Sequence, residues 1–270
     1  MSEKSISIIV PALDEEGNIR SVCEDIAQLA EKHLSKYEIL VYDDASHDRT
    51  AEIVEELQKA NEHILLFRNS TSQGLGGVYR AGVRKARYQY VMLIPGDNQV
   101  VAESLEGIFA QIGTTDVIVC YITNQEVRAF RRQLISRLFT GVLNFLFWLN
   151  LGYYNGTSVI RTALVTRYLP YTSGYAYMAV ILVHLLKLGT PYKQMGFAIR
   201  KRQYGVTKAF RFKNILSVMK NVIVLFWKVM VCRQLQHSKL ETLQGKEIKH
   251  QNLPNISILD EQVVSKKGKL

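Results

Sequence analysis

Residues 90–100 read Tyr-Val-Met-Leu-Ile-Pro-Gly-Asp-Asn-Gln-Val, and the rest of the chain is organised around them. Its apolar first half stops abruptly at Pro95, as a buried parallel strand does when it reaches the carboxyl edge of a sheet. Ligands of open α/β sheets bind outside that edge. Asp97 and the amide of Gln99 offer hard oxygen ligands there, which suit a hydrated divalent cation on a diphosphate. A strand that ends in an ordinary polar turn is the alternative interpretation of Asp97 taken alone.

Apolar runs and helical patterns alternate on both sides of that strand. The first part of the chain is predicted to form strands over residues 6–10, 37–42, 63–67, 90–94 and 117–121, with helices between them. Strand and helix that alternate in this way are typical of a βαβ array. We therefore expect an α/β fold with a mostly parallel sheet flanked by helices.

Acidic residues follow three of these predicted strands. Asp14 and Glu15 come after the first strand, Asp43 and Asp44 after the second, and Asp97 after the fourth. Because parallel strands end at the same edge of a sheet, these carboxylates line one crevice, where the ribose hydroxyls and base amides of a nucleotide can donate to them. The nearby glycine-rich stretch 74–77 lacks the pattern of a phosphate-binding loop, and we interpret its glycines as close helix packing.

The composition of the 270 residues narrows the class of protein. At 47% hydrophobic residues the chain has enough apolar surface for a core, which excludes disorder throughout. Its three cysteines are scattered and odd in number, so they indicate neither a disulfide framework nor a zinc site and favour a reducing compartment. The first residues show no pattern of a secretory signal.

Charge is distributed very unevenly along the chain. Residues 127–240 carry 18 Lys and Arg and no Asp or Glu, whereas the remainder holds 16 of the 34 basic residues and all 24 acidic ones. The second half is therefore expected to face something anionic. The candidates are nucleic acid, an anionic membrane surface and a phosphorylated substrate.

Three further stretches resemble a known family. Residues 8–19 read Ile-Ile-Val-Pro-Ala-Leu-Asp-Glu-Glu-Gly-Asn-Ile, residues 41–50 read Val-Tyr-Asp-Asp-Ala-Ser-His-Asp-Arg-Thr, and Gly74-Leu75-Gly76 is followed by Arg80-Ala81-Gly82. They resemble family 2 glycosyltransferases with a GT-A (Rossmann-like) fold, and within that family the dolichol- or polyprenol-phosphate hexosyltransferase branch. The resemblance covers roughly residues 5–230 and implies a GT-A fold for this chain.

The resemblance also implies roles for the residues at the strand ends. It places a nucleotide-sugar donor on Pro11, Leu13, Glu15, Asp43, Asp44, Asp97 and Gln99. It further implies that Asp97 is catalytic and that Asp97 and Gln99 hold the cofactor, Mg²⁺ or Mn²⁺. The branch often carries Asp-x-Asp, but the first of those positions is Pro95 here. The cation would keep one fewer protein carboxylate, for which Asn98 compensates weakly.

Basic residues of the second half fit a phosphate acceptor. Residues 202–208 read Arg-Gln-Tyr-Gly-Val-Thr-Lys and resemble the branch's Arg-x-x-Gly-x-Ser-Lys loop, with Thr for Ser. Guanidinium, hydroxyl and ammonium groups around a flexible glycine make a phosphate clamp, and a solvated basic turn is the alternative. The acceptor phosphate is expected at Arg131, Arg132, Ser136, Arg202, Thr207 and Lys208, with Arg202 also catalytic. Which of the two adjacent arginines makes the contact stays open.

The lack of acids in residues 127–240 bears on the mechanism. A sugar hydroxyl that attacks a donor usually needs a carboxylate base within hydrogen-bond reach. A phosphate monoester is already anionic at neutral pH and needs only to be positioned. The absence of acids therefore favours a lipid phosphate as acceptor, although Asp97 or another carboxylate of the first half could still serve as a base.

Two apolar stretches of the second half are interpreted differently. Residues 215–232 are interrupted by Lys220 and Lys228, so we expect an amphipathic helix over 211–235 that lies in the membrane interface. Residues 134–151 are interpreted as a buried core helix. The expected domains are thus a catalytic domain over 1–210 with a nucleotide-sugar half (1–125) and an acceptor half (126–210), the interfacial helix, and a polar tail over 236–270.

These observations predict an inverting glycosyltransferase. It would move a hexose from a UDP- or GDP-sugar to polyprenyl or dolichyl phosphate at the cytoplasmic face of an anionic membrane, with no nucleic acid as partner. A family 2 transferase that acts on a sugar hydroxyl is the first alternative. A non-catalytic protein that binds anionic ligands on a degenerate GT-A domain is the second. The sequence leaves open which sugar is transferred and whether the chain forms a homo-oligomer.

Overall fold

The computed structural model describes residues 4–167, 174, 176–201 and 212–231. Its elements are, in order, β1 Ser5–Ala12, α1 Ile19–His33, β2 Lys36–Asp43, α2 Thr50–Ala60, β3 Ile64–Arg68, α3 Gly74–Lys85, β4 Tyr90–Leu93, α4 Ala102–Ala110, β5 Val117–Ile122, a 3₁₀ turn Gln125–Val127, α5 Phe130–Phe147, β6 Val159–Arg161, α6 Thr162–Arg167, α7 Tyr177–Lys187, β7 Tyr192–Phe197, α8 Phe212–Phe226 and a π-helical turn Trp227–Val231. Residues Met1–Val229 form one compact unit. The boundary predicted at residue 210 lies outside the described residues.

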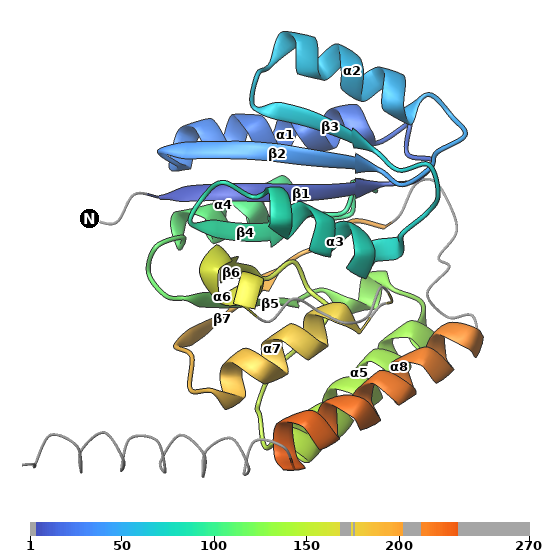
Figure 1. Ribbon diagram of the computed structural model, residues 1–270, viewed down its shortest axis with the longest axis vertical. Coiled ribbons are helices and arrows are strands. Elements are labelled where there is room, and N and C mark those ends of the chain that lie inside the picture. Colours follow the sequence, from blue (N-terminus) through green and yellow to red (C-terminus); the bar gives the residue numbers. More distant parts are fainter. Residues whose placement is uncertain (1–3, 168–173, 175, 202–211, 232–270) are drawn as a thin grey trace, which may run out of the picture. The chain divides into compact units, whose positions relative to one another are not determined.

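A single seven-stranded sheet organises this unit, in the order β3-β2-β1-β4-β6-β5-β7 (Figure 1). The strands are parallel except β6, which runs antiparallel to both β4 and β5. The five predicted strands are confirmed with small shifts of their ends, as is the α/β class. The edge strand β7 was not predicted, because its residues Tyr-Lys-Gln-Met-Gly-Phe show no apolar run; the first three are exposed and only Phe197 is buried.

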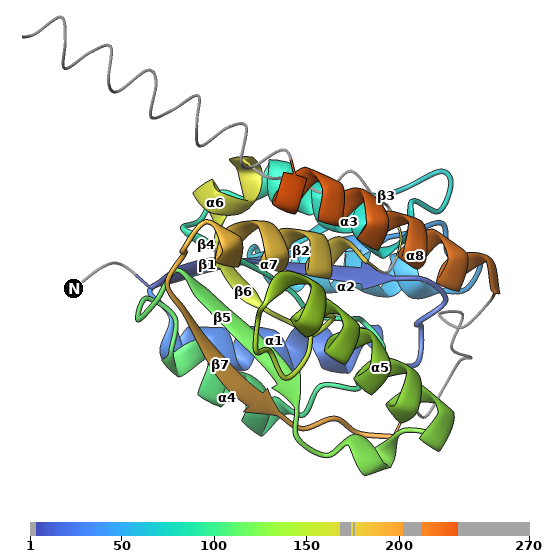
Figure 2. The same cartoon turned by 90° about the horizontal axis from the view of Figure 1, so that it is seen from below.

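Helices cover both faces of the sheet. Figure 2 shows α1 and α4 on one face and α3 and α7 on the other. Alternate residues of β1 serve the two faces, as a pleated strand requires: Ile8 belongs to the core under α1, whereas Ile9 packs against α3. Helix α3 can approach so closely because Gly82 has no side chain. A Cβ at that position would lie 2.5 Å from Cδ1 of Ile9.

The strand order creates the crevice that the sequence predicts. From β1 the chain adds β2 and then β3 on one side. It then crosses back to add β4 on the other side of β1, so the direction in which strands are added reverses at β1. Open α/β sheets bind ligands at such a point. The register pairs Ala12 with Asp43 and Ile9 with Leu93, so the loops after β1, β2 and β4 leave the sheet at the same edge.

Helices α5 and α8 are in contact (Figure 1), and both carry exposed apolar side chains. The rings of Phe147 and Phe226, near the ends of the two helices, lie 6.2 Å apart. The prediction that residues 134–151 form a buried core helix is wrong for most of α5, in which only Leu143 and Phe147 are buried. Its exposed apolar side chains are Phe130, Leu134, Ile135, Leu138, Val142 and Phe145, followed by Trp148. Among the described residues, no helix combines the length and apolar character needed to cross a bilayer.

Candidate functional site

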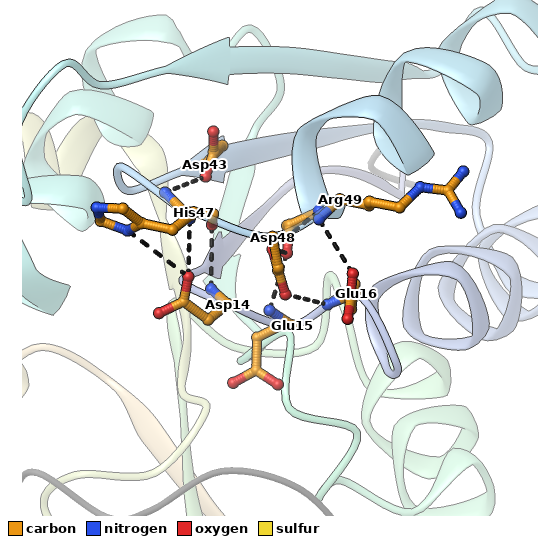
Figure 3. Close-up of polar contacts among 9 residues, drawn as sticks. Asp14, Glu15, Glu16, Asp43, His47, Asp48 and Arg49 are labelled. Atoms are coloured by element: carbon orange, nitrogen blue, oxygen red, sulfur yellow. Dashed lines mark hydrogen bonds and ion pairs between the residues drawn. The ribbon is translucent and has the colours of Figure 1, made fainter.

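Two neighbouring loops at the carboxyl edge of the sheet are tied together by hydrogen bonds (Figure 3). We call residues 13–18 and 44–49 the strand-end loops, because they follow β1 and β2. The carboxylate of Asp14 accepts a bond from the His47 backbone N–H at 2.9 Å, and the Asp14 N–H donates to Ser46 Oγ at 3.0 Å. Asp14 adopts a left-handed conformation, with φ of 57°, which such cross-loop bonds stabilise.

A second set of bonds joins the same loops farther along. The Glu16 N–H donates to Oδ2 of Asp48 at 3.0 Å, and the Arg49 N–H donates to Oε2 of Glu16 at 3.1 Å. Asp48 also accepts a bond from the N–H of Thr50, the first residue of α2. Burial opposes ionisation of Asp48, but these bonds outweigh it and lower the pKa of its carboxyl. The acidic residues of these loops thus fix the backbone around them.

Asp44 organises the start of α3. Its buried carboxylate accepts four hydrogen bonds, at 2.7 to 3.0 Å, from Asn69 Nδ2, Ser72 Oγ and the backbone N–H groups of Gln73 and Gly74. The last two belong to the helix N-terminus, where N–H groups lack partners within the helix. Burial opposes ionisation, yet the four bonds hold the pKa of Asp44 below its ordinary value.

The other predicted nucleotide ligands also lie at this edge. Asp43 is 2% exposed and accepts a bond from the Ser46 N–H at 2.9 Å, and Glu15 is 7% exposed and accepts one from Asn18 Nδ2 at 2.7 Å. Pro11 and Leu13 are half-buried. The backbone oxygen of Pro11 accepts a bond from the Gly96 N–H at 3.1 Å, so the ends of β1 and β4 are in contact. The structure therefore brings the predicted set to one place.

Asp97 lines a small pocket after β4. The β4 pocket, as we name it, is bounded by Asn18, Asp97, Asn98, Arg200 and Lys201. The connection that follows β4 is tightly turned: the Gln99 N–H donates to Oδ1 of Asp97 at 3.3 Å, and Asn98 has a left-handed φ of 52°. Sequence reasoning missed Arg200 and Lys201. The run Arg-Lys-Arg at 200–202 could have indicated them, but only its third residue matches the Arg-x-x-Gly-x-Ser-Lys pattern.

The donor set of this pocket fits a divalent cation that is held mainly by a substrate. Asp97 supplies one carboxylate, and the amide side chains of Asn18 and Asn98 line the same space. Mg²⁺ typically keeps several waters and binds one or two carboxylates together with substrate phosphates. In the described part of the chain, no three His, Cys, Asp or Glu side chains gather into a site that would bind a metal unaided.

The predicted acceptor ligands are described only in part. Arg131, Arg132 and Ser136 lie in the first two turns of α5, with Arg131 exposed and the other two half-buried. Arg202, Thr207 and Lys208 lie outside the described residues. One further cation was missed: Arg128, just before α5, donates from Nη1 to the Tyr153 hydroxyl at 3.2 Å, and its guanidinium lies over that ring.

Solved structures of known function share this fold. The chain superposes on glucosyl-3-phosphoglycerate synthase from Mycobacterium tuberculosis, solved with Mn²⁺, UDP and glucosyl-3-phosphoglycerate, with a TM-score of 0.58. The match covers 84% of this chain and 80% of that one at 18% identity. The same enzyme has also been solved with Mg²⁺ and UDP. At this identity the likeness establishes the GT-A type of fold.

Sequence relatives point in the same direction. An uncharacterized protein of Methanocaldococcus jannaschii is 25% identical over 228 residues, which are 80% of this chain and 96% of that protein. A dolichyl-phosphate beta-glucosyltransferase of Trichomonas vaginalis is 33% identical over 34% of this chain and 30% of its own length. A dolichyl-phosphate beta-glucosyltransferase of Dictyostelium discoideum is 28% identical over 43% of this chain and 38% of its own length. The model of the family Glycosyl transferase family 2 matches residues 7–169, more than half of the chain. The chain therefore belongs to glycosyl transferase family 2 and is a glycosyltransferase.

Proposed function

We propose that this glycosyltransferase moves a hexose from a nucleotide sugar to a polyprenyl or dolichyl phosphate at the cytoplasmic face of a membrane. The observation that carries the proposal is the surface formed by α5 and α8, which exposes apolar side chains and belongs to a stretch without acidic residues. A long prenyl chain with an anionic head needs such a combination of apolar and cationic surface. Two relatives named dolichyl-phosphate beta-glucosyltransferases support this choice of acceptor.

The apolar surface follows one side of each helix. Leu134, Leu138 and Val142 recur every four residues along α5. Met219 and Ile223 of α8 continue at the same spacing to Trp227, the first residue of the π-helical turn after it. Phe145 and Trp148 are 79% and 81% exposed, values that are unusual for such large apolar side chains in contact with water only. Arg137 lies on α5, Lys220 on α8 and Lys228 in the π-helical turn after it, and their long stems allow the charge to remain at the lipid headgroups.

The donor side of the proposal rests on the strand-end loops and the β4 pocket. The nucleotide would lie along the edge formed by Pro11, Leu13 and Glu15, with its diphosphate directed toward Asp97. Structural neighbours that bind UDP with Mn²⁺ or Mg²⁺ support a nucleotide sugar and a divalent cation. When bound, that cation would stabilise negative charge on the departing diphosphate. Asp97 would hold it, and Gln99 is the second proposed ligand.

The proposed reaction is an inverting displacement at the anomeric carbon. A phosphate oxygen of the acceptor forms a bond to that carbon, while the bond from the carbon to the diphosphate oxygen breaks and the nucleoside diphosphate leaves with the electron pair. The attacking oxygen is already anionic, so no base is needed. Arg131 or Arg132, with Ser136, would align the acceptor at the start of α5, and Arg202, Thr207 and Lys208 complete the predicted clamp.

Transfer of labelled sugar tests the proposal directly. The full chain in detergent would receive UDP- and GDP-sugars, polyprenyl phosphate, and Mg²⁺, Mn²⁺ or a chelator. We expect lipid-linked label in a phosphodiester with one of the donors. The Arg131→Ala/Arg132→Ala variant should raise the apparent KM for the acceptor about tenfold and leave that for the donor unchanged. Arg84→Ala, which removes an exposed charge from α3, is the matched control. Label on a sugar hydroxyl instead of the lipid would contradict the proposed acceptor.

Binding to vesicles tests the membrane surface separately. The Phe145→Ser/Trp148→Ser variant should fold with unchanged stability, since both side chains are largely exposed, but should bind anionic vesicles about tenfold more weakly. Flotation of the protein with vesicles of phosphatidylcholine and phosphatidylserine measures this. Tyr192→Ser, on the edge strand, is a control that changes an exposed aromatic residue away from α5 and α8. Equal flotation of all three proteins would exclude this surface as the membrane contact.

A further inference from the structure

The two cations of the β4 pocket lie at the end of a segment whose backbone is held on both sides. The Arg200 N–H donates to the Gln99 oxygen at 2.7 Å, and the Val101 N–H donates to the Ala198 oxygen at 3.2 Å, so residues 198–200 run beside the segment that follows Asp97. From the other side, the Asn124 side chain accepts a bond from the Ile199 N–H at 2.9 Å and donates to the Ile199 oxygen at 2.8 Å. Arg200 therefore belongs to a fixed segment, and Lys201 is the next residue along the chain.

These side chains are well placed to bind an anion. Both are exposed and line the pocket together with Asp97. Among the residues that the structure describes, neither Arg200 nor Lys201 forms an ion pair with a carboxylate. The charged side chains that line the pocket sum to one positive charge before any metal binds. A metal held by a pair of carboxylates would instead sit in a neutral site, and here Pro95 occupies the position of the second carboxylate.

We propose that Arg200 and Lys201 bind the diphosphate of the nucleotide donor directly and replace part of the charge neutralisation that a fully coordinated metal would supply. This inference rests on the proposed function, because it assumes a nucleotide donor. Arginine can bind phosphate oxygens in a bidentate manner, and lysine acts as a mobile point charge. The consequence is that a nucleoside diphosphate binds to this chain in the absence of a divalent cation.

Calorimetric titration of the full chain with UDP and with GDP, in Mg²⁺ and in chelator, tests this without any turnover. For the nucleotide that binds, chelator should weaken the wild-type affinity less than about threefold. In chelator, the Arg200→Ala/Lys201→Ala variant should bind that nucleotide about tenfold or more weakly than the wild type does. Lys193→Ala removes an exposed cation from β7 and should bind like the wild type. Pro95→Asp should make binding depend more strongly on Mg²⁺, because it adds a second carboxylate.

Each other outcome has a definite meaning. Unchanged UDP and GDP affinity in the double variant would show that the two cations belong to a solvated surface and would overturn the inference. Loss of wild-type binding in chelator would overturn it as well. A titration with a short prenyl phosphate serves as the comparison. If the double variant binds this phosphate more weakly but binds UDP and GDP like the wild type, the pocket takes the acceptor phosphate and the donor assignment is wrong. Absence of nucleotide binding even with Mg²⁺ would overturn the proposed function itself.

Discussion

The carboxylates of the strand-end loops and the carboxylate of the β4 pocket lie at one edge of the same sheet, yet their surroundings differ. Asp44 and Asp48 accept several hydrogen bonds from the protein, and the pKa of each is lowered as a result. Asp97 accepts a bond from the Gln99 N–H and lines a pocket together with Arg200 and Lys201. The first group shapes the edge, and the second belongs to the wall of a pocket.

The comparison shows that an acidic motif does not by itself identify ligand contacts. The motif over residues 41–50, which contains Asp43 and Asp44, belongs to a glycosyltransferase family, but the Asp44 oxygens hold the start of α3 in place. Its contribution to nucleotide binding would then be indirect, through the position of that helix. Separate measurements of stability and of activity can distinguish a carboxylate that holds the fold from one that contacts a ligand.

The largest effect is expected at Asp97. Asp97→Asn keeps the size of the side chain and removes its charge, so transfer activity should fall about 100-fold or more. The free energy of unfolding should change by less than about 0.5 kcal/mol, because the side chain is only half-buried. Urea denaturation beside the transfer assay measures both. A variant that unfolds more easily and loses activity in proportion would place Asp97 with the structural carboxylates.

Asp44 should show the reverse pattern. Asp44→Ala leaves the Gln73 and Gly74 N–H groups and the side chains of Asn69 and Ser72 without their acceptor, so the free energy of unfolding should fall by about 3 kcal/mol. Urea denaturation followed by circular dichroism measures this. Unchanged stability with a weakened affinity for nucleotide would make Asp44 a direct ligand and would remove the distinction drawn above.

The same residue predicts an acid dependence of stability. The pKa of Asp44 is lower in the folded chain than its ordinary value of 3.8, so its contribution is complete above that value and is lost as the pH falls through the folded pKa. The difference in unfolding free energy between the wild type and Asp44→Asn should therefore be constant from pH 6 to about 5 and should shrink below about pH 4. A difference that does not vary with pH would contradict the assignment.

The smallest effect is expected at Asp48. Its side chain accepts bonds from the Glu16 and Thr50 N–H groups, one across the loops and one at the first residue of α2. Asp48→Ala should reduce the unfolding free energy by about 1 kcal/mol, because these N–H groups lose their acceptor. Asp48→Ser restores an acceptor oxygen and should recover much of it. A loss as large as that of Asp44→Ala would show that the loops depend on each other more than their separate bonds indicate.

Much of the fold was predictable because it depends on local patterns. Apolar runs gave the first five strands, and their parallel arrangement followed from the helices between them. The insertion of β6 between β4 and β5 was not predictable, since its pairing joins segments far apart in the chain. For α5, the spacing of apolar residues indicates which of them share a face but not whether a neighbour covers that face. The burial of Leu143 and exposure of Leu138 are decided by the tertiary arrangement.

The site was predictable to a similar degree. The strand ends identified Asp97 and the loops beside it, because parallel strands bring their carboxyl ends to one edge. Arg200 and Lys201 were not predicted, because they reach the pocket only through the pairing of residues 198–200 with the segment after β4. The hydrogen bonds of Asp44 could not be foreseen either, since their donors at Asn69 and Ser72 come from a connection without a regular pattern.

The position of β6 also has a consequence for how the chain acquires its structure during synthesis. Strands β1 to β4 pair with one another and can do so once residue 93 has emerged from the ribosome. Strand β5 pairs only with β6 and β7 among the described strands, and both are synthesised later. The apolar residues Val-Ile-Val-Cys-Tyr-Ile of β5 must therefore wait, unpaired, until the chain has passed residue 161. During that interval β5 is an apolar strand without a partner, and unpaired apolar strands are prone to aggregation.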